Sequence, residues 1–405
     1  MGGGWVSAQS NLVLTPPITK RAMRASRSTI FSALFILFGF AQTVVLTVLP
    51  VEALNVLGEA RLVSLAYLGV GLAGFAGRLS LPLLVRRFQR SGVLALGAGC
   101  LCASGLLLLT ATVAGLVLGL LLNVFALGCL EIVLNLCVLD QIPRAELGRF
   151  EAKRIFFGAT PYTVGPWLGV WLQINVVVWL PFLVSAASGI ALMLSLRGSI
   201  AAEPRRRAPP RPPQNPLRSV RRFFAQPRLR LAWVLSVGRS SWWNMFQVYA
   251  PIYAVQSGLG AELGGAIVST GLGMMWTVPL WGWLGRRYGV RKLFVAGYAA
   301  SGLVTLVTAL LMQSAWLGAI ALILGALATE VLDGAGNSLY LRAVHPYERS
   351  EMTAVFASYR DATQLLPPAV FTALLTFFEL PAVFVAGGMM MLGMAGLSRY
   401  IPRRF

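Results

Sequence analysis

Charged residues are scarce in this sequence, and acidic ones are the scarcest. Only 12% of the 405 residues are charged, and 14 Asp and Glu stand against 34 Lys and Arg. A soluble domain carries about a quarter charged residues, so a soluble chain of this length could not cover its domains with polar surface. With 57% apolar residues and a mean hydropathy of +0.72, the composition indicates an all-α membrane protein. Its long continuous apolar runs favour helices over the alternating pattern of an outer-membrane barrel.

Cysteine and histidine are also rare, which excludes several kinds of site. The four cysteines, Cys100, Cys102, Cys129 and Cys137, lie in apolar segments without paired Cys-x-x-Cys spacing, so neither a disulfide framework nor a metal centre is expected. The single histidine, His345, lies in a Val-His-Pro turn and is interpreted as an exposed loop residue rather than a proton relay. No nucleophile elbow, metal cluster or phosphate loop occurs at a credible position. We therefore expect no enzyme activity, no cofactor and no bound metal.

Apolar segments long enough to cross a bilayer recur along the whole chain. A span needs about 20 apolar residues, and an even number of spans places both termini on one side. Nearly all of the 34 basic residues then fall in the termini and in every second loop, which predicts that both termini are cytoplasmic. The net charge of +20 is thereby explained by topology, and no nucleic-acid partner is expected. The twelve predicted spans lie near 29–54, 62–85, 91–111, 113–139, 152–174, 176–196, 231–255, 262–285, 290–311, 315–341, 350–377 and 380–399.

The N-terminal segment lacks a cleavable signal, so we expect the first helix to act as its own insertion signal. The Arg-rich composition and the short loops indicate a bacterial inner membrane.

One loop, residues 197–230, is predicted to be a linker. Its prolines between 209 and 216 favour a stiff, extended connector. The part from Leu217 to Leu231 mixes arginine with Phe223 and Phe224 and is expected to lie on the anionic inner leaflet, with a regulatory or partner-binding role as the alternative. The predicted organisation is a cytoplasmic segment (1–28), a six-helix bundle (29–196), the linker (197–230), a second six-helix bundle (231–399) and a cytoplasmic tail (400–405).

The two predicted bundles repeat each other in sequence. A near-constant offset at equivalent points of equivalent spans predicts two pseudo-symmetric bundles, with a substrate site between them near mid-membrane. At offsets of 200 to 202, Arg86-Arg87-Phe88 recurs as Arg286-Arg287-Tyr288, Arg149-x-Glu151 as Arg349-x-Glu351, Glu131 and Asn135 as Asp333 and Asn337, and Pro166 as Pro367.

This pattern over all twelve spans resembles the major facilitator superfamily. In that family the loops after the second and eighth spans carry Gly-x-Leu-Ala-Asp-Arg-x-Gly-Arg-Lys. Residues 282–292 match this motif with Arg286 in place of the acid, and residues 82–91 keep Arg87 but again lack the acid. The family's acid helps to latch the two halves together, so the resemblance implies a gating role for these loops without that latch. The residues that carry this role are Arg87, Gly282, Arg286, Arg287 and Gly289.

The fifth predicted span contains Gly158, Gly165-Pro166 and Gly169. This looks like the motif of drug–proton antiporters in the family, which ends Gly-Pro-x-x-Gly-Gly, although Pro161 and Val170 depart from it. The resemblance favours export. Close helix packing through small residues is the equal alternative.

Ionisable residues inside spans are candidates for function, because a charge there costs several kcal/mol unless it is paired or solvated. At 1.5 Å per residue, five of them lie roughly 12–14 Å inside the membrane, with Glu330 about one turn deeper. Convergence on one level predicts a shared cavity. The five are Glu131, Arg239, Asp333, Arg360 and Asp361.

The acids outnumber the arginines within the spans, so at least one carboxyl group is expected to lack a permanent partner and to carry a proton. We favour Asp333 or Glu131 for this role, with Glu330 and Asp361 as further proton-coupling candidates. The alternative is a set of fixed ion pairs, such as Asp361 with Arg360 or Asp333 with Arg239, and Arg78 offers a third cation.

The expected substrate-binding residues are polar and aromatic groups that share these helix faces. For the aromatic residues, ordinary helix packing is the alternative. The set is Gln42, Arg239, Trp243, Gln247, Tyr249, Asn337, Arg360 and Gln364.

Three functions fit the sequence. The favoured one is a monomeric, proton-coupled secondary transporter that exports a small amphiphilic organic solute by alternating access, in a bilayer with an anionic inner leaflet. The second is an importer of an organic anion that uses Arg239 and Arg360 as carboxylate clamps. The third is a membrane scaffold or cofactor-delivery factor that kept the fold and lost transport.

Overall fold

The computed structural model describes residues 17–142, 147–201, 216–336, 338–345 and 348–402, and all regular structure among them is helical. The elements are α1 (Pro17–Thr43), α2 (Val48–Leu57), α3 (Ala60–Leu108), α4 (Val113–Gln141), α5 (Leu147–Asn175), α6 (Leu180–Ala201), α7 (Pro216–Ala225), α8 (Pro227–Gln256), α9 (Ala261–Gly273), the 3-10 helix η1 (Met274–Thr277), α10 (Val278–Tyr288), α11 (Val290–Leu311), α12 (Ala315–Ala335), α13 (Ser338–Ala343), α14 (Arg349–Ala357), α15 (Tyr359–Phe377) and α16 (Pro381–Ser398).

Each predicted span lies largely within helix, but only some of these helices are strongly apolar. Among the described residues, nine helical segments are long and apolar enough to cross a membrane. The predicted spans at 152–174, 231–255 and 350–377 are helical without reaching that hydropathy. Those three contain internal prolines or charged residues, so the count of twelve spans remains a prediction.

Turns with unusual backbone angles separate several helices. Gly58 ends α2 with φ +77°, and Gly289 separates α10 from α11 with φ +92°. Within α3 the chain bends at Gln89, which has φ +60° and ψ 171°. Such a conformation is ordinary for glycine and strained for other residues. Gln89 and Gly289 are 200 positions apart, so both copies of the repeat turn at the same place.

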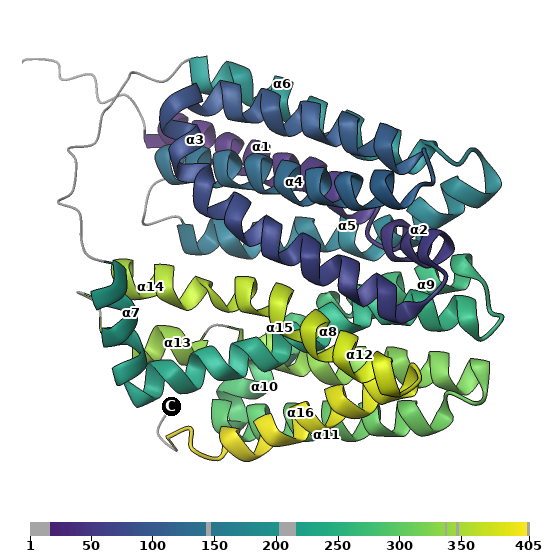
Figure 1. Cartoon of the computed structure of the whole chain (residues 1–405). Helices are drawn as coiled ribbons and strands as arrows, with labels where there is room; N and C mark the ends of the chain where they lie inside the picture. The colour runs from purple at the N-terminus through teal and green to yellow at the C-terminus, as the bar shows by residue number, and fades with distance from the viewer. Residues whose placement is uncertain (1–16, 143–146, 202–215, 337, 346–347, 403–405) are drawn as a thin grey trace, which may run out of the picture.

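The helices form two groups that follow the order of the chain. Figure 1 shows α1 and α3–α6 in the upper part and α7, α8 and α10–α16 in the lower part, with α2 and α9 on the right where the groups meet. We call α1–α6 the N-terminal half and α7–α16 the C-terminal half. One cluster of buried apolar residues lies entirely between Phe31 and Leu196, and a second extends from Val45 to Ile401. The halves contact each other where α2 packs on α8, α3 on α15, and α5 on α9.

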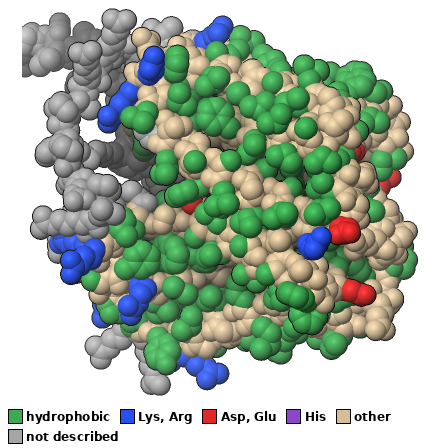
Figure 2. Space-filling model, in the orientation of Figure 1, with side chains coloured by type: hydrophobic (Ala, Val, Ile, Leu, Met, Phe, Trp, Pro, Cys, Tyr) green, Lys and Arg blue, Asp and Glu red, His purple; other side chains and the backbone are tan. Residues whose placement is uncertain are grey.

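Charge is distributed unevenly between the two ends of the molecule. Figure 2 shows most of the visible Lys and Arg side chains at the left end and most of the Asp and Glu toward the right end. In Figure 1, α1 begins and α16 ends on that same left side. The basic residues and both described chain ends thus share one end, the arrangement expected of a positive-inside protein.

The helical part of the linker packs against the C-terminal half. Phe223 on α7 is fully buried, and the ring of Phe224 lies 5.4 Å from that of Trp233 on α8. Arg222 pairs with the buried Glu348, which also accepts a hydrogen bond of 3.2 Å from Gln226. The expectation that this segment lies on the inner leaflet therefore needs correction for Phe223, because its side chain is buried in protein. The proline-rich residues 202–215 lie outside the described part of the chain.

Candidate functional site

An ion pair inside the C-terminal half joins α8 to α12. Nη1 of Arg239 lies 3.2 Å from Oδ1 of Asp333, and the indole N–H of Trp243 donates to Oδ2 of Asp333 at 2.8 Å. Arg239 is only 7% exposed. Both oxygens of Asp333 thus have a donor. The structure shows the fixed pair that the sequence left open as an alternative, rather than a partnerless Asp333.

Glu330 lies one turn from Asp333 on the same face of α12, and it is 2% exposed. It interacts electrostatically with Asp333 and Arg239, but no described residue forms an ion pair or hydrogen bond with its carboxyl group. An ionised carboxylate without a partner is costly to bury. Among the acids of this cluster, Glu330 is therefore the one best placed to take up a proton.

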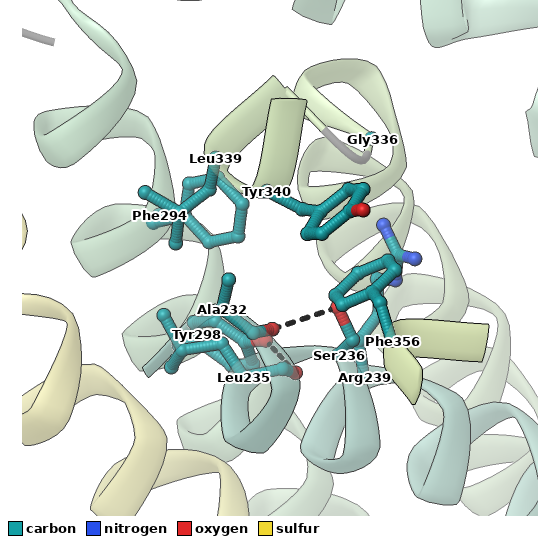
Figure 3. A pocket seen from close by; sticks show the side chains of 10 residues that line it. All are labelled: Ala232, Leu235, Ser236, Arg239, Phe294, Tyr298, Gly336, Leu339, Tyr340 and Phe356. Atoms are coloured by element: carbon teal, nitrogen blue, oxygen red, sulfur yellow. Dashed lines mark hydrogen bonds between the residues drawn. The ribbon is translucent and has the colours of Figure 1, made fainter. Parts of the chain in front are cut away.

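A small cavity of about 10 Å³ lies beside Arg239, roughly the space of one water molecule. Figure 3 shows Arg239 reaching up from α8 next to Tyr340 and Phe356, whose stacked rings lie 4.1 Å apart. Across the cavity, the hydroxyl of Tyr298 donates to the carbonyl of Leu235. This cavity is too small for an organic solute and is compatible with a water molecule at Arg239.

A second polar cluster joins the two halves. Nη1 of Arg78 on α3 lies 3.1 Å from Oδ1 of Asp361 on α15. With the amide of Gln364 oriented so that its oxygen faces Arg78, that oxygen accepts from Nη2 at 2.8 Å. Both charged side chains are partly accessible, at 30% and 27%. The alternative pair of Asp361 with Arg360 does not form. Arg78, which the sequence offered only as a third cation within the spans, is thus the partner of Asp361.

Arg360 and Glu131, like Glu330, form no ion pair among the described residues. Arg360 is exposed and contacts its neighbour Tyr359, with Cζ 5.8 Å from the ring centre and Nε 3.4 Å from the hydroxyl. Glu131 on α4 is partly buried and interacts electrostatically with Arg360 on α15. These two opposite charges come from opposite halves.

The remaining predicted solute contacts differ in their surroundings. The hydroxyl of Tyr162 on α5 donates to Oε1 of Gln42 on α1 at 3.2 Å. Tyr249 is buried and shares a hydrogen bond of 2.5 Å with Ser64 across the two halves. Gln247 is partly buried. Asn337 lies outside the described residues. The structure therefore places Tyr249 in the contact between the halves.

The residues assigned to the gating loops make local contacts. The guanidinium of Arg87 lies 5.9 Å from the ring centre of Phe88, and that of Arg287 lies 5.3 Å from Trp283 and 5.6 Å from Tyr288. Arg286 is exposed, and no ion pair ties it to the other half in the part of the chain that the structure describes. At Gly282, a Cβ would lie 3.2 Å from the carbonyl oxygen of Gly334, so this position holds α10 close to α12.

The glycines of the antiporter-like motif hold α5 against α1. A Cβ at Gly165 would overlap Thr43, and one at Gly169 would overlap the carbonyl oxygen of Val44. Thr43 in turn donates to the carbonyl of Pro161 at 2.8 Å. Close helix packing, the alternative interpretation of the motif, is thus present at both glycines.

An open cleft of about 500 Å³ lies at the contact between the halves. Its lining includes Glu59 and Arg61 at the start of α3, Gln256 at the end of α8 and Glu379 in the turn before α16. Within the described ranges, no three His, Cys, Asp or Glu residues are placed to hold a metal ion.

Comparisons with known proteins give one family match and a set of similar solved structures. The model of the Major Facilitator Superfamily matches residues 260–404. A search of curated proteins gives no match. Among solved structures, the nucleoside transporter NupG is 13% identical, with a TM-score of 0.69 over 92% of this chain and 98% of that one.

Two peptide-transporter structures are equally similar. A POT family transporter in complex with a thioalcohol-conjugated peptide is 11% identical, with a TM-score of 0.70 over 91% of this chain and 94% of that one. The peptide transporter POT in complex with sulfate is 14% identical, with a TM-score of 0.67 over 92% of each chain. At these identities the structures show a shared fold, and the match to the family model is confined to the C-terminal part of the chain.

Proposed function

We propose that this chain, a transporter of the Major Facilitator Superfamily type, moves a small amphiphilic organic solute by alternating access coupled to protons, with export as the favoured direction. The halves at 29–196 and 231–399 rock against each other around a site between them. The protein acts as a monomer in a bacterial inner membrane, with both termini cytoplasmic. Solute, protons and anionic inner-leaflet lipid are its partners.

The single observation that carries the proposal is an ion pair between the two halves, formed by side chains of otherwise apolar helical segments. Arg78 and Asp361 are 3.1 Å apart and belong to α3 and α15. Intramembrane charges normally face a bundle interior or a wet cavity and mark pathways for solutes or ions. Contacts of this kind between the moving halves are what a transport site requires.

Glu330 is the proposed proton carrier. Asp333 already receives Arg239 and Trp243, and Asp361 receives Arg78. Glu330 is buried beside these groups without a partner of its own among the described residues. A proton neutralises it, and loss of that proton adds a negative charge that repels Asp333 and competes with it for Arg239.

The solute-contacting groups are those that remain accessible near the contact between the halves. Gln364 and Arg360 of the C-terminal half and Gln42 and Glu131 of the N-terminal half supply these polar and charged contacts. Of the similar solved structures, one is described as a nucleoside transporter and another as a complex with a thioalcohol-conjugated peptide. These descriptions support a small organic solute for this chain.

Import of an organic anion is the second candidate, and the exposure of Arg360 favours it. An accessible guanidinium can bind a carboxylate with two parallel hydrogen bonds. Arg239, the other arginine considered for this role, is buried and paired with Asp333, so a solute reaches it only after that pair opens. Import therefore depends on Arg360 alone in the conformation seen.

The test is transport in proteoliposomes with an imposed pH gradient and a panel of solutes of different charge. Export by proton antiport predicts solute uptake when the lumen is acidic. Import by symport predicts uptake when the outside is acidic. Loss of both, with no solute-dependent proton flux for any panel member, would contradict transport and favour a scaffold role.

A further inference from the structure

The exposed face of η1 and α10 carries large apolar side chains that lead to a basic residue. Trp276, Leu280 and Trp283 are 43%, 51% and 45% exposed, and the exposed Arg287 follows one turn later. Spacings of three and four residues keep these side chains on one face of a helix. We call Trp276, Leu280, Trp283 and Arg287 the α10 stripe.

The stripe points away from the packed side of α10. On that packed side, a Cβ at Gly282 would lie 3.2 Å from the carbonyl oxygen of Gly334 on α12, and one at Gly285 would lie 3.1 Å from the side chain of Leu293 on α11. Because α12 also carries Asp333, the stripe faces away from the charge cluster of the C-terminal half. An exposed run of large apolar side chains on this outer side suits the hydrocarbon of a bilayer.

The guanidinium of Arg287 is oriented but not neutralised. It contacts two exposed rings, 5.3 Å from the ring centre of Trp283 and 5.6 Å from that of Tyr288. None of the ion pairs of the described residues includes Arg287. Contact with aromatic rings holds a guanidinium in place, and its N–H groups can still bind a phosphate with two parallel hydrogen bonds.

The equivalent segment of the N-terminal half lacks most of these features. At the offset of 200, the three apolar positions of the stripe are occupied by the smaller residues Ala76, Ser80 and Leu83. Arg87, the counterpart of the basic residue, contacts one ring, with its Cζ 5.9 Å from the ring centre of Phe88. The stripe is therefore a feature of the C-terminal copy and not of every span that ends in arginine.

The stripe has the length of one leaflet and ends at the contact between the halves. Trp276 and Arg287 are eleven residues apart, which is roughly 16 Å along a helix and about half the hydrocarbon thickness of a bilayer. The indole N–H of Trp276 donates to Thr163 of α5 at 3.1 Å, and its ring lies 4.9 Å from that of Phe156. An acyl chain along the stripe therefore extends from Arg287 to the other half.

The charges around the stripe select the headgroup. Residues 276–292 contain four basic residues and no acidic one, so a phosphate is attracted there and the ammonium group of a zwitterionic headgroup meets only like charge. We propose that the α10 stripe binds one anionic phospholipid of the inner leaflet, with the phosphate on Arg287 and one acyl chain along the apolar residues. The inference rests on the proposed partnership with anionic lipid and gives it a site, but it does not depend on transport of a solute.

The test is native mass spectrometry of the full-length protein released from detergent and titrated with phosphatidylglycerol, phosphatidylethanolamine or inorganic phosphate. We expect the parent to retain one phosphatidylglycerol under conditions that remove phosphatidylethanolamine. Arg287→Gln should weaken this binding about tenfold, the effect of one lost charge-assisted hydrogen bond. Trp283→Leu, which copies the residue of the N-terminal half, should weaken it about threefold through the lost ring contact. Inorganic phosphate should not displace the lipid, because phosphate lacks the acyl chain.

Arg87→Gln is the matched control, since it removes the same charge at the equivalent position of the other half and should leave the affinity unchanged. Both test substitutions change exposed side chains, and the thermal unfolding temperature of each variant checks that it folds. Equal weakening by Arg87→Gln, equal retention of phosphatidylethanolamine, or displacement by inorganic phosphate would overturn the site. A dimer that excludes the lipid would also overturn it, by showing that a second copy of the chain covers the stripe.

Two further outcomes separate this site from the proposed function. A parent that prefers phosphatidylglycerol, with unchanged affinity in both Arg287→Gln and Trp283→Leu, would keep the partnership with anionic lipid and overturn the α10 stripe as its site. A protein that binds the lipid as expected but moves no solute in proteoliposomes would retain the site and lose only the proposed transport.

Discussion

The buried charges of the two halves are paired in different ways. In the C-terminal half, Asp333 forms an ion pair with Arg239 and accepts a hydrogen bond from Trp243, all within that half. In the N-terminal half, Glu131 is the repeat counterpart of Asp333, but the position 200 residues before Arg239 is Gly39, which packs against Pro161. Glu131 thus lacks the arginine that Asp333 has.

The difference indicates which charges would change partners in the alternating access that we propose. The C-terminal cluster is neutralised internally, so it can move as one body. Of the site charges in the N-terminal half, Arg78 pairs with Asp361 of the other half, and Glu131 interacts electrostatically with Arg360 without forming an ion pair. Separation of the halves therefore exposes the N-terminal charges and leaves the C-terminal pair intact.

Removing one partner of the internal pair should give the largest loss of stability. Arg239→Ala leaves Asp333 without its cation next to the buried Glu330, and breaking a buried pair in this way costs about 3 kcal/mol or more. We expect a marked fall in the thermal unfolding temperature of the purified protein in detergent.

The matched change in the other half is Glu131→Gln, which removes a charge that has no ion-pair partner among the described residues. We expect it to leave the unfolding temperature within a degree or two of the parent. Equal destabilisation by the two substitutions would contradict the contrast between the halves.

A smaller loss of stability is expected at Gly169, where the N-terminal half packs more tightly than the C-terminal half does at the equivalent position. Gly169 on α5 touches the backbone of Val44, whereas its counterpart by the offset of the paired prolines is Val370. Gly169→Ala should destabilise by about 2 kcal/mol through overpacking, as measured by thermal unfolding. Gly158→Ala is the control, because a Cβ there meets nothing within 4 Å. If the motif acts in export alone, both variants would keep parental stability.

The smallest effect on stability, and the only expected gain, is at the equivalent turns of the two halves. Gly289 adopts φ +92° without strain, whereas Gln89 holds φ +60° with a side chain. Gln89→Gly should raise stability by about 1 kcal/mol, because strain of this kind costs about that much or more. Gln89→Ala keeps the Cβ and should give no gain. A loss of stability in Gln89→Gly would mean that the Gln89 side chain makes a contact that outweighs the strain.

The sequence predicted the helices well because their apolar runs and turns are local signals. The span at 290–311 coincides with α11, and the offset of 200 brings Gln89 and Gly289 to equivalent turns. The spans at 152–174, 231–255 and 350–377 are the ambiguous ones. They carry prolines and charges in place of apolar residues, as helices that line the contact between halves do.

The pairing of the charges could not be predicted, because it depends on how the halves dock. Helical spacing predicted that Glu330 and Asp333 share one face of α12. It did not predict that Arg239 and Trp243 each contact one oxygen of Asp333. Arg78 was expected only as a third cation, because its pairing with Asp361 depends on the packing of α3 against α15.

The most direct test of the central claim compares two kinds of transport in Glu330→Gln, a variant of nearly unchanged size that cannot release a proton. Solute accumulation driven by a pH gradient and solute–solute exchange without a gradient are measured in the same proteoliposomes. Proton coupling through Glu330 predicts that gradient-driven accumulation is lost while exchange persists. Accumulation at the parental level in Glu330→Gln would contradict it.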